Sequence, residues 1–439
     1  MAAESYKEMK NLLTDDNIYR VLDTEDESDV FSEQSGDFWF NTSEEDSEGD
    51  SDTSSIVHES ESYEEVSDFL QPFVPHGMAR PRFAFLSVSG VNVDFDGEIS
   101  VLECFQKFID EDMWQLFAEQ TNIYANQFLA TNTNLKPRYR ARSWMDTKPT
   151  EMKTLNGLLT LQGILQKPEN GMYFFKRESI VTPYFSQIMR EKCFHLLIKF
   201  LHFADSSKFD PDQYHKKLYK IQPILYHLKS KFSSVYTPER NICVDESLLL
   251  WKGRLGWIQY EPTKRSRFGV KIYKLRESST GYVWNFIVYT GKDTIYGQRH
   301  PGEQTSSRIV LEVVHDLLDK GYCLYLNNWY TSPKLVDTLC TRKRDDVGTM
   351  RTNKKEFPNF VKRARLKTGE TVAAFRKKQM ITKWKDKRDV VLVSTFHDDS
   401  VENVTTRRVI QKPSVVCDYN KNMVGVDGND GQLHSYKLA

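Results

Sequence analysis

Residues 241–251 read Asn-Ile-Cys-Val-Asp-Glu-Ser-Leu-Leu-Leu-Trp, a short apolar run with Asp245 near its centre. Such a run is typical of a buried strand. Two later segments also place a polar group beside apolar residues: Leu326-Asn327-Asn328-Trp329 and Val424-Gly425-Val426-Asp427. Carboxylates carried by distant segments can converge on a pair of divalent cations. The middle segment has Asn327 where a carboxylate is expected, so one amide decides whether that chemistry is available.

The segments after residue 241 alternate between strand and helix patterns. After the first strand, the predicted elements are a hairpin of two strands (269–275 and 282–290), a helix (307–320), a strand (322–326), a helix (333–341) and a strand (346–350). Strand, hairpin, helix, strand, helix, strand is the order of a ribonuclease H-like α/β core with a mixed sheet. In that fold the first and fourth strands lie side by side. The pattern therefore predicts that Asp245 lies next to Asn327.

The chain before this core divides into two parts. Residues 1–75 are predicted to be a disordered tail, because their acidic, serine-rich sequence offers too few apolar groups to offset chain entropy. Residues 95–240 are predicted to form a helical domain, since apolar residues recur there at helical spacing. The core is assigned to residues 241–350 and, after a basic insertion at 351–412, to a final segment at 413–439.

Charge is distributed very unevenly. Residues 1–70 carry a net charge of −19 and the remainder +18, although the whole chain is close to neutral at −1. Residues 342–388 contain 17 Lys and Arg against five Asp and Glu, with aromatic residues between them. A basic body indicates a polyanionic ligand such as nucleic acid, and the acidic tail could compete with that ligand. A solvated surface and a solubilising tail are the plainer interpretations of the same two patterns.

The predicted DNA-contacting residues are basic side chains of two groups. The first surrounds the expected mouth of the site, and the second lies in the basic segment. They are Lys264, Arg265, Arg267 and Lys271, then Lys354, Lys355, Lys362, Arg363, Arg365, Lys367, Arg376, Lys377 and Lys378.

Six cysteines lack any Cys-x-x-Cys spacing, which argues against a zinc ribbon or a redox motif. No long uncharged apolar run is present, so we expect no membrane partner. Unpaired thiols are typical of a reducing compartment, cytosol or nucleus.

Several motifs resemble the piggyBac transposases, and among them the piggyBac transposable element-derived proteins of vertebrates. The motifs are Val-Asp-Glu-Ser at 244–247, Arg-Phe-Gly-Val-Lys at 267–271, Gly-Tyr-Val-Trp-Asn at 281–285, Asn-Trp-Tyr-Thr-Ser-Pro at 328–333 and Gly-Val-Asp at 425–427. The resemblance covers about residues 95–436 and is highly specific. It implies a ribonuclease H-like catalytic domain with three catalytic Asp, a helical dimerisation and DNA-binding domain before it, and an insertion domain.

By this resemblance Asp245 is the first catalytic acid and Asp427 the third, while the second falls on Asn327. An amide has no charge to offset a dication, so the triad is expected to be vestigial. A weak Mg²⁺ or Mn²⁺ site at Asp245 and Asp427 remains compatible with it, and no other cofactor is expected. The family continues with a cysteine-rich zinc module, and the sequence stops 12 residues after Asp427, so no zinc is expected.

The sequence therefore predicts a domesticated, piggyBac-derived nuclear protein that binds double-stranded DNA mostly through backbone contacts, without cleavage. A homodimer is compatible with the resemblance. Two alternatives stay open. One is an active or partly active metal-dependent transposase, in which Asn327 still binds a cation or Asp430 supplies the missing carboxylate. The other is a nuclear protein-interaction module.

Overall fold

The computed structural model describes residues 72–95, 99–210, 215–251, 253–262, 267–292, 294–297, 299–405 and 409–423. Residues 1–71 of the predicted acidic tail, together with Asp427, Asp430, Lys264 and Arg265, lie outside the described residues. Residues 72–75 are described, and Val74 pairs with Phe375, so the prediction of disorder up to residue 75 is wrong for this last part.

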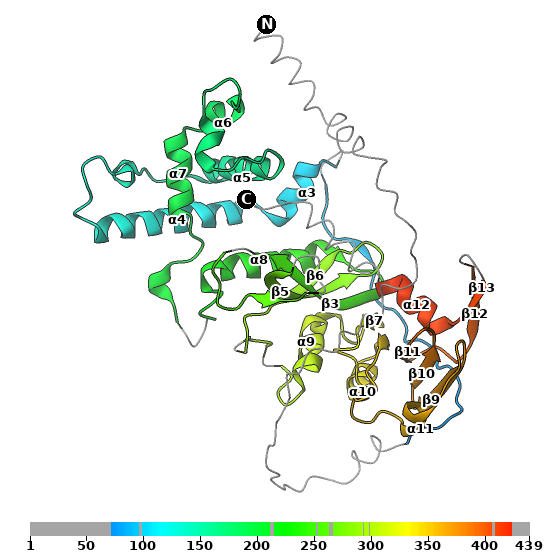
Figure 1. The fold of residues 1–439 in the computed structure, drawn as a ribbon. Coiled ribbons are helices and arrows are strands. Elements are labelled where there is room, and N and C mark those ends of the chain that lie inside the picture. Colours follow the sequence, from blue (N-terminus) through cyan, green and yellow to red (C-terminus); the bar gives the residue numbers. More distant parts are fainter. Residues whose placement is uncertain are drawn as a thin grey trace. The chain divides into compact units, whose positions relative to one another are not determined.

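A mixed sheet forms the centre of the described chain (Figure 1). Its strand order is β4-β5-β3-β7-β8-β11-β10-β9, with β6 also paired to β5. The strands are β3 (Asn241–Leu250), β4 (Gln259–Tyr260), β5 (Phe268–Glu277), β6 (Val283–Val288), β7 (Cys323–Leu326), β8 (Asp345–Thr349), β9 (Thr371–Arg376), β10 (Gln379–Lys385) and β11 (Asp389–Ser394). β3, β7 and β8 run parallel, whereas β5 and β6 are antiparallel to their neighbours. This is the predicted ribonuclease H-like order, and the expected pairing of the first and fourth strands is confirmed.

The basic segment differs from the expectation of an inserted domain. Its strands β9, β10 and β11 continue the central sheet, because β11 pairs with β8 from Val347 to Thr349. Pairing satisfies the backbone of β8, which would otherwise be an open sheet edge. The high charge of residues 371–385 concealed two strands, whose side chains are mostly buried despite that charge. β12 (Val401–Thr405) and β13 (Val409–Pro413) form a separate two-stranded sheet near the end of this segment.

Helices cover both faces of the sheet around β3 and β7. α9 (Thr305–Val313) packs against Ile242, Val244 and Leu326 in the main apolar core. It ends before the predicted limit at 320, and a 3-10 turn (His315–Leu317) follows it. α12 (Ser414–Met423) lies on the other face, where the Tyr325 hydroxyl donates to Asp418 at 2.8 Å. α10 (Pro333–Thr341) has the predicted bounds, with Ser332 capping its first turn.

A helical region precedes the sheet, as predicted. Its helices are α3 (Val101–Phe108), α4 (Glu111–Thr131), α5 (Pro149–Ile164), α6 (Pro183–Ile188), α7 (Glu191–Phe200) and α8 (Gln222–Val235). Ser100 and Asp110 cap α3 and α4 by accepting backbone N–H groups. α3 and α4 are tied to α8 by the ion pair between Lys231 and Asp110 at 2.6 Å. Among the described residues, no helix combines the length and apolarity that a membrane span requires.

Residues 72–92 form an extended strap along the edge at which the parallel strands begin. Val74 pairs with Phe375 of β9 at one end, and Gly90 pairs with Thr237 of β2 (Tyr236–Thr237) at the other. Between these points, the strap passes so close to Gly321 that a Cβ there would lie 1.8 Å from the Ala84 carbonyl oxygen. Gly321 also has a φ of +76°, which disfavours any other residue. Both the close contact with Ala84 and this backbone conformation therefore exclude a larger side chain.

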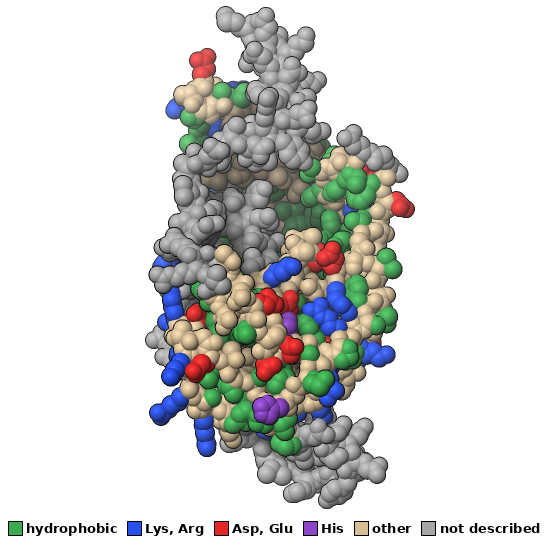
Figure 2. Space-filling model, turned by 90° about the vertical axis from the view of Figure 1, so that its right-hand side faces the viewer, with side chains coloured by type: hydrophobic (Ala, Val, Ile, Leu, Met, Phe, Trp, Pro, Cys, Tyr) green, Lys and Arg blue, Asp and Glu red, His purple; other side chains and the backbone are tan. Residues whose placement is uncertain are grey.

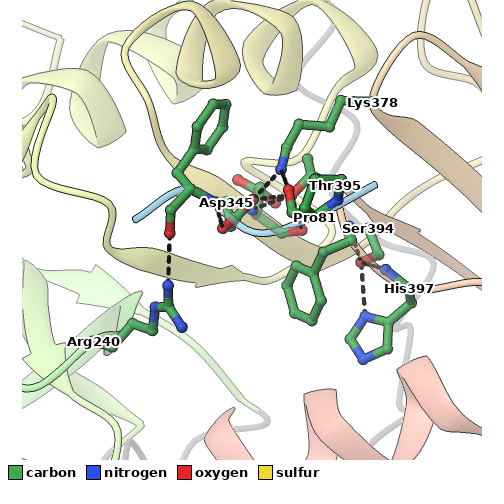
Figure 3. A network of polar contacts seen from close by, with 10 residues as sticks. Pro81, Arg240, Asp345, Lys378, Ser394, Thr395 and His397 are labelled. Carbon is green, nitrogen blue, oxygen red and sulfur yellow. Dashed lines mark hydrogen bonds and ion pairs between the residues drawn. The ribbon is translucent and has the colours of Figure 1, made fainter. Parts of the chain in front are cut away.

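The central anchor of the strap is a buried ion pair (Figure 3). Asp345 accepts from the Lys378 ammonium at 2.7 Å, from the Phe83 N–H at 3.0 Å and from the Thr395 hydroxyl at 3.1 Å. Lys378 also donates to the Pro81 carbonyl, and Arg240 donates to the Phe83 carbonyl. Asp345 thus joins β8, the turn between β9 and β10, and the strap at one carboxylate.

Replacing Asp345 with Ala should lower the free energy of unfolding by about 3–5 kcal/mol, because it leaves the Lys378 ammonium without its buried partner. Urea denaturation of the purified chain measures this loss. Asp319→Ala is the matched control, since Asp319 pairs with Arg342 where both side chains are exposed. Its loss should stay below about 1 kcal/mol. Equal losses in the two variants would contradict the anchoring role of Asp345.

Candidate functional site

The parallel pairing of β3 and β7 brings Asp245 and Asn327 together. Val244 pairs with Leu326, the last residue of β7, so the next residue on each strand emerges at the same place. The Asn327 side-chain N–H donates to the Asp245 carboxylate at 2.6 Å. The predicted contact between the first two positions of the triad is therefore present.

The Asn327 amide is held at both ends. Its nitrogen faces two carboxylates, Asp245 at 2.6 Å and Glu246 at 3.4 Å, and its oxygen accepts from the Trp329 backbone N–H at 2.9 Å. The two carboxylates can only accept, so they face the Asn327 nitrogen, and the backbone N–H can only donate, so it faces the Asn327 oxygen. The oxygen that could bind a cation therefore points away from Asp245.

Glu246 belongs to this site although sequence reasoning did not single it out. Its carboxylate accepts from the Tyr330 hydroxyl at 3.0 Å, and Tyr330 is fully buried. Burial, and then the charge of Glu246, raise the pKa of Tyr330 well above its ordinary value, so the hydroxyl stays a donor. The only signal in the sequence was that Glu246 directly follows Asp245. Its contact with Tyr330 becomes visible only in the folded chain.

The loop after β7 is rigidly packed. The Trp329 ring lies parallel to Tyr273 of β5, with centroids 6.0 Å apart and an interplanar angle of 4°. The Thr331 hydroxyl donates to the Asn327 carbonyl at 2.8 Å. These contacts fix the backbone on both sides of Asn327, so its amide orientation is set by the fold.

Three basic side chains surround these groups. Burial lowers the pKa of Lys271, but the nearby Glu246 and Glu261 carboxylates outweigh it and raise the pKa above its ordinary value. Lys354 donates to the Trp329 carbonyl at 2.9 Å, and Arg351 donates to the Asn328 side chain at 3.2 Å. Burial, and then the charge of Arg351, lower the pKa of Lys354. Arg351 was missed in the sequence, because nothing in the basic segment marks which of its residues returns to the site.

Two predicted DNA contacts have structural roles instead. Arg376 is buried and pairs with Asp337 and Glu356, each at 2.9 Å. Lys378 pairs with the buried Asp345 under the strap. The Arg376 charge is neutralised inside the fold, so the prediction that Arg376 contacts phosphates is wrong. Lys378 is partly exposed, and its ammonium is already bonded to Asp345 and the Pro81 carbonyl.

The remaining predicted contacts in the basic segment divide by exposure. Lys354 is partly buried, as its bond to Trp329 requires. The exposed ones are Lys355, Lys362, Arg363, Arg365, Lys367 and Lys377, and Arg267 at the start of β5 is exposed as well. Lys362 and Arg363 end the short helix α11 (Asn359–Arg363), which packs beside β9.

The described residues do not fit a pair of divalent cations. No group of three His, Cys, Asp or Glu side chains in the described ranges could hold a metal ion. One oxygen of Asp245 is occupied by an N–H donor, where a cation would need another oxygen ligand. The structure describes α12 only up to Met423, so the expected third acid, Asp427, lies beyond the described residues.

Comparison with known proteins identifies this architecture. Residues 100–439 match the family model described as Transposase IS4. A solved structure, the cryo-EM structure of a piggyBac transposase synaptic complex with hairpin DNA, superposes with a TM-score of 0.68 over 80% of this chain and 72% of that one, at 24% identity. The fold is therefore that of a ribonuclease H-like transposase.

The chain belongs to this transposase family, and within it to the piggyBac type. It is 24% identical over 352 residues to human PiggyBac transposable element-derived protein 3, covering 77% of this chain and 56% of that protein. It is 24% identical over 384 residues to human PiggyBac transposable element-derived protein 2, covering 82% and 60%. The chain thus spans somewhat more than half the length of these relatives, and it is a transposase-derived protein.

Replacing Asn327 with Asp should lower the free energy of unfolding by about 2–3 kcal/mol without divalent cations. The change removes a hydrogen bond to a charged group and brings two carboxylates together. Mn²⁺ should restore much of the melting temperature by bridging them. Asn327→Ala loses the same bond without adding charge, so its melting temperature should not respond to Mn²⁺. An equal Mn²⁺ response in both variants would contradict this account of the site.

Proposed function

We propose that the protein binds double-stranded DNA and does not cleave it. The observation that carries the proposal is the 2.6 Å contact in which Asn327 donates to Asp245. An N–H group there occupies the position that a cation between two carboxylates would need.

Cleavage of a phosphodiester bond in this fold depends on metal chemistry. Two divalent cations about 3.5–4 Å apart activate the attacking oxygen and stabilise the leaving oxygen. Exchange of a carboxylate for a neutral amide removes a Coulomb attraction of about 4 kcal/mol per unit charge at 4 Å and an effective dielectric of about 20. At 1.36 kcal/mol per decade, a loss of that size is about a thousandfold in rate.

Binding is supported by basic side chains on the surface. Lys362, Arg363, Arg365 and Lys367 are exposed on and just after α11. Arg351 and Lys354 extend the positive charge to the Asn328-Trp329 loop. On the face shown in Figure 2, Lys and Arg side chains project from the surface with acidic residues among them. Lysine and arginine on a surface bind the phosphate backbone without reading sequence. The solved relative with hairpin DNA supports the same ligand class.

The proposal includes a nuclear location, which the exposed basic run Lys362-Arg363-Ala364-Arg365-Leu366-Lys367 supports. It also includes weak retention of at most one Mg²⁺ or Mn²⁺ ion at Asp245. Self-association as a homodimer belongs to the same proposal, by analogy with the synaptic complex formed by the solved relative.

A plasmid-nicking assay with Mg²⁺ or Mn²⁺ tests the absence of cleavage. The native chain should leave supercoiled plasmid intact, and Asn327→Asp should gain nicking if the rest of the site is in place. The double variant Asp245→Asn/Asn327→Asp is the control and should be inactive. Clear metal-dependent nicking by the native chain would contradict the proposal and would point to Glu246 as the substitute carboxylate.

The salt dependence of DNA affinity tests the binding mode. Log K should fall linearly with log salt, by about 0.9 for each phosphate contact, so Lys362→Gln/Arg363→Gln should reduce the slope by about 1.8. Lys320→Gln/Arg342→Gln removes the same charge just before the starts of β7 and β8 and should leave the slope unchanged. Fluorescence anisotropy on a short blunt duplex measures both. A slope near zero for the native chain would favour a protein-interaction module instead.

A further inference from the structure

Three aromatic residues form a row across the end of the sheet beyond the acids. Tyr260 of β4 pairs directly with Phe268 of β5. On the other side of Phe268, the backbone N–H of Trp251 donates to the Phe268 carbonyl, one step past the pairing of Leu250 with Gly269. Residues that lie opposite each other in antiparallel strands present their side chains on the same face. Trp251, Phe268 and Tyr260 therefore stand side by side on one face, and we define them as the aromatic row.

The aromatic row is open to solvent. Its side chains are 41%, 55% and 56% exposed for Trp251, Phe268 and Tyr260. The Phe268 and Tyr260 rings lie 4.6 Å apart, centroid to centroid, with an interplanar angle of 34°. Adjacent exposed aromatic rings leave apolar faces in water, which makes the row a candidate contact surface for a ligand.

Two glycines let the backbone pack closely beside the row. A Cβ on Gly269 would lie 2.1 Å from the Leu249 carbonyl oxygen, so only glycine lets β5 approach β3 this closely beside Phe268. The backbone at Gly253 also lies against the Trp251 indole, where a Cβ would be 2.7 Å from the ring nitrogen. The backbone is thus closely packed beside Phe268 and Trp251, although the outer surfaces of these rings are exposed.

The row lies on the same face of the sheet as the candidate site. The register between β3 and β5 is continuous from Ile242 to Leu250, and Trp251 follows Asp245 by six residues. An even separation along a strand keeps two side chains on one face. Six residues correspond to ~20 Å of strand, the length of about six nucleotide steps in duplex DNA.

Charge next to the row selects a polyanion. Arg254 and Arg267 are both exposed. Arg254 follows Gly253, which lies against the Trp251 indole, and Arg267 lies just outside β5 at the end of the sheet that carries the row. Aromatic rings with basic neighbours bind unpaired nucleotides, because every base has a face that stacks while phosphates contact the cations. Bases inside a duplex are already stacked on one another and cannot use such a row. A purely apolar peptide would leave the two guanidinium groups without a role.

We propose that the aromatic row is a stacking platform for unpaired DNA bases, about six nucleotide steps from the Asp245–Asn327 contact. The inference rests on the proposed DNA binding and adds that the preferred ligand carries a single-stranded stretch. Phosphates of that stretch would contact Arg254 and Arg267. A duplex with a frayed or extended end would then occupy the candidate site and the row together.

The test compares a blunt duplex with the same duplex carrying a single-stranded overhang of about six nucleotides. The native chain should bind the overhang DNA about tenfold more tightly than the blunt DNA, a ratio typical of one or two stacked bases. The triple variant Trp251→Leu/Tyr260→Leu/Phe268→Leu keeps apolar bulk but removes the rings. It should bind both DNAs with the affinity that the native chain has for the blunt duplex. Tyr226→Leu, which removes another exposed ring, is the matched control and should keep the preference.

A 2-aminopurine base in the overhang reports stacking directly, because its fluorescence is quenched on an aromatic ring. Quenching by the native chain and by Tyr226→Leu, but not by the triple variant, is the expected result. Blunt-duplex binding without preference or quenching would overturn the stacking platform and leave the proposed function standing. Absence of binding to both DNAs would overturn the proposed function itself. A change of oligomeric state in the triple variant, seen by light scattering, would reassign the row to contact between copies of the chain.

Discussion

The parallel pairing of β3 with β7 is the constraint on which the rest of the structure depends. Its last pair, Val244 with Leu326, decides that the next residues, Asp245 and Asn327, share one position at the end of β7. A slip of one residue would turn Asp245 to the α9 side and bury it in the apolar core. Burial of Val244 and Leu326, both fully inaccessible, fixes the register against such a slip.

The two ends of the parallel strands are therefore specialised. At one end, β3 and β5 extend past β7 and carry the carboxylates and then the exposed aromatic row. At the other end, the strap lies across the starts of the strands and is anchored by the ion pair between Asp345 and Lys378. A segment distant in the sequence thus stabilises the end of the sheet that has no part in the proposed chemistry, and leaves the other end accessible.

Some basic residues of segment 342–388 are paired with carboxylates in the fold, and others are exposed on the surface. Burial without a partner is costly for a charge, so Arg376 and Lys383 in the sheet, and Lys378 in the turn between β9 and β10, each face a carboxylate. Lys362, Arg363, Arg365 and Lys367, on and just after α11, are exposed and can contact a ligand. At the candidate site, the same rule favours Asn327. An amide donor is compatible with two neighbouring carboxylates, whereas a third carboxylate there would require a cation.

The sequence by itself determined the order of the core elements, the family, and the pairing of Asp245 with Asn327. These follow from local apolar periodicity and from motifs whose residues are contiguous. It did not reveal that β9 to β11 extend the central sheet, that Arg376 and Lys378 are paired with carboxylates in the fold, or that Arg351 and Glu246 join the site. Tertiary structure alone decided these, because a charged side chain is internal or external according to the partner that folding brings to it. The same holds for Trp251, Tyr260 and Phe268, which are separated in the chain and become one surface only when three strands align.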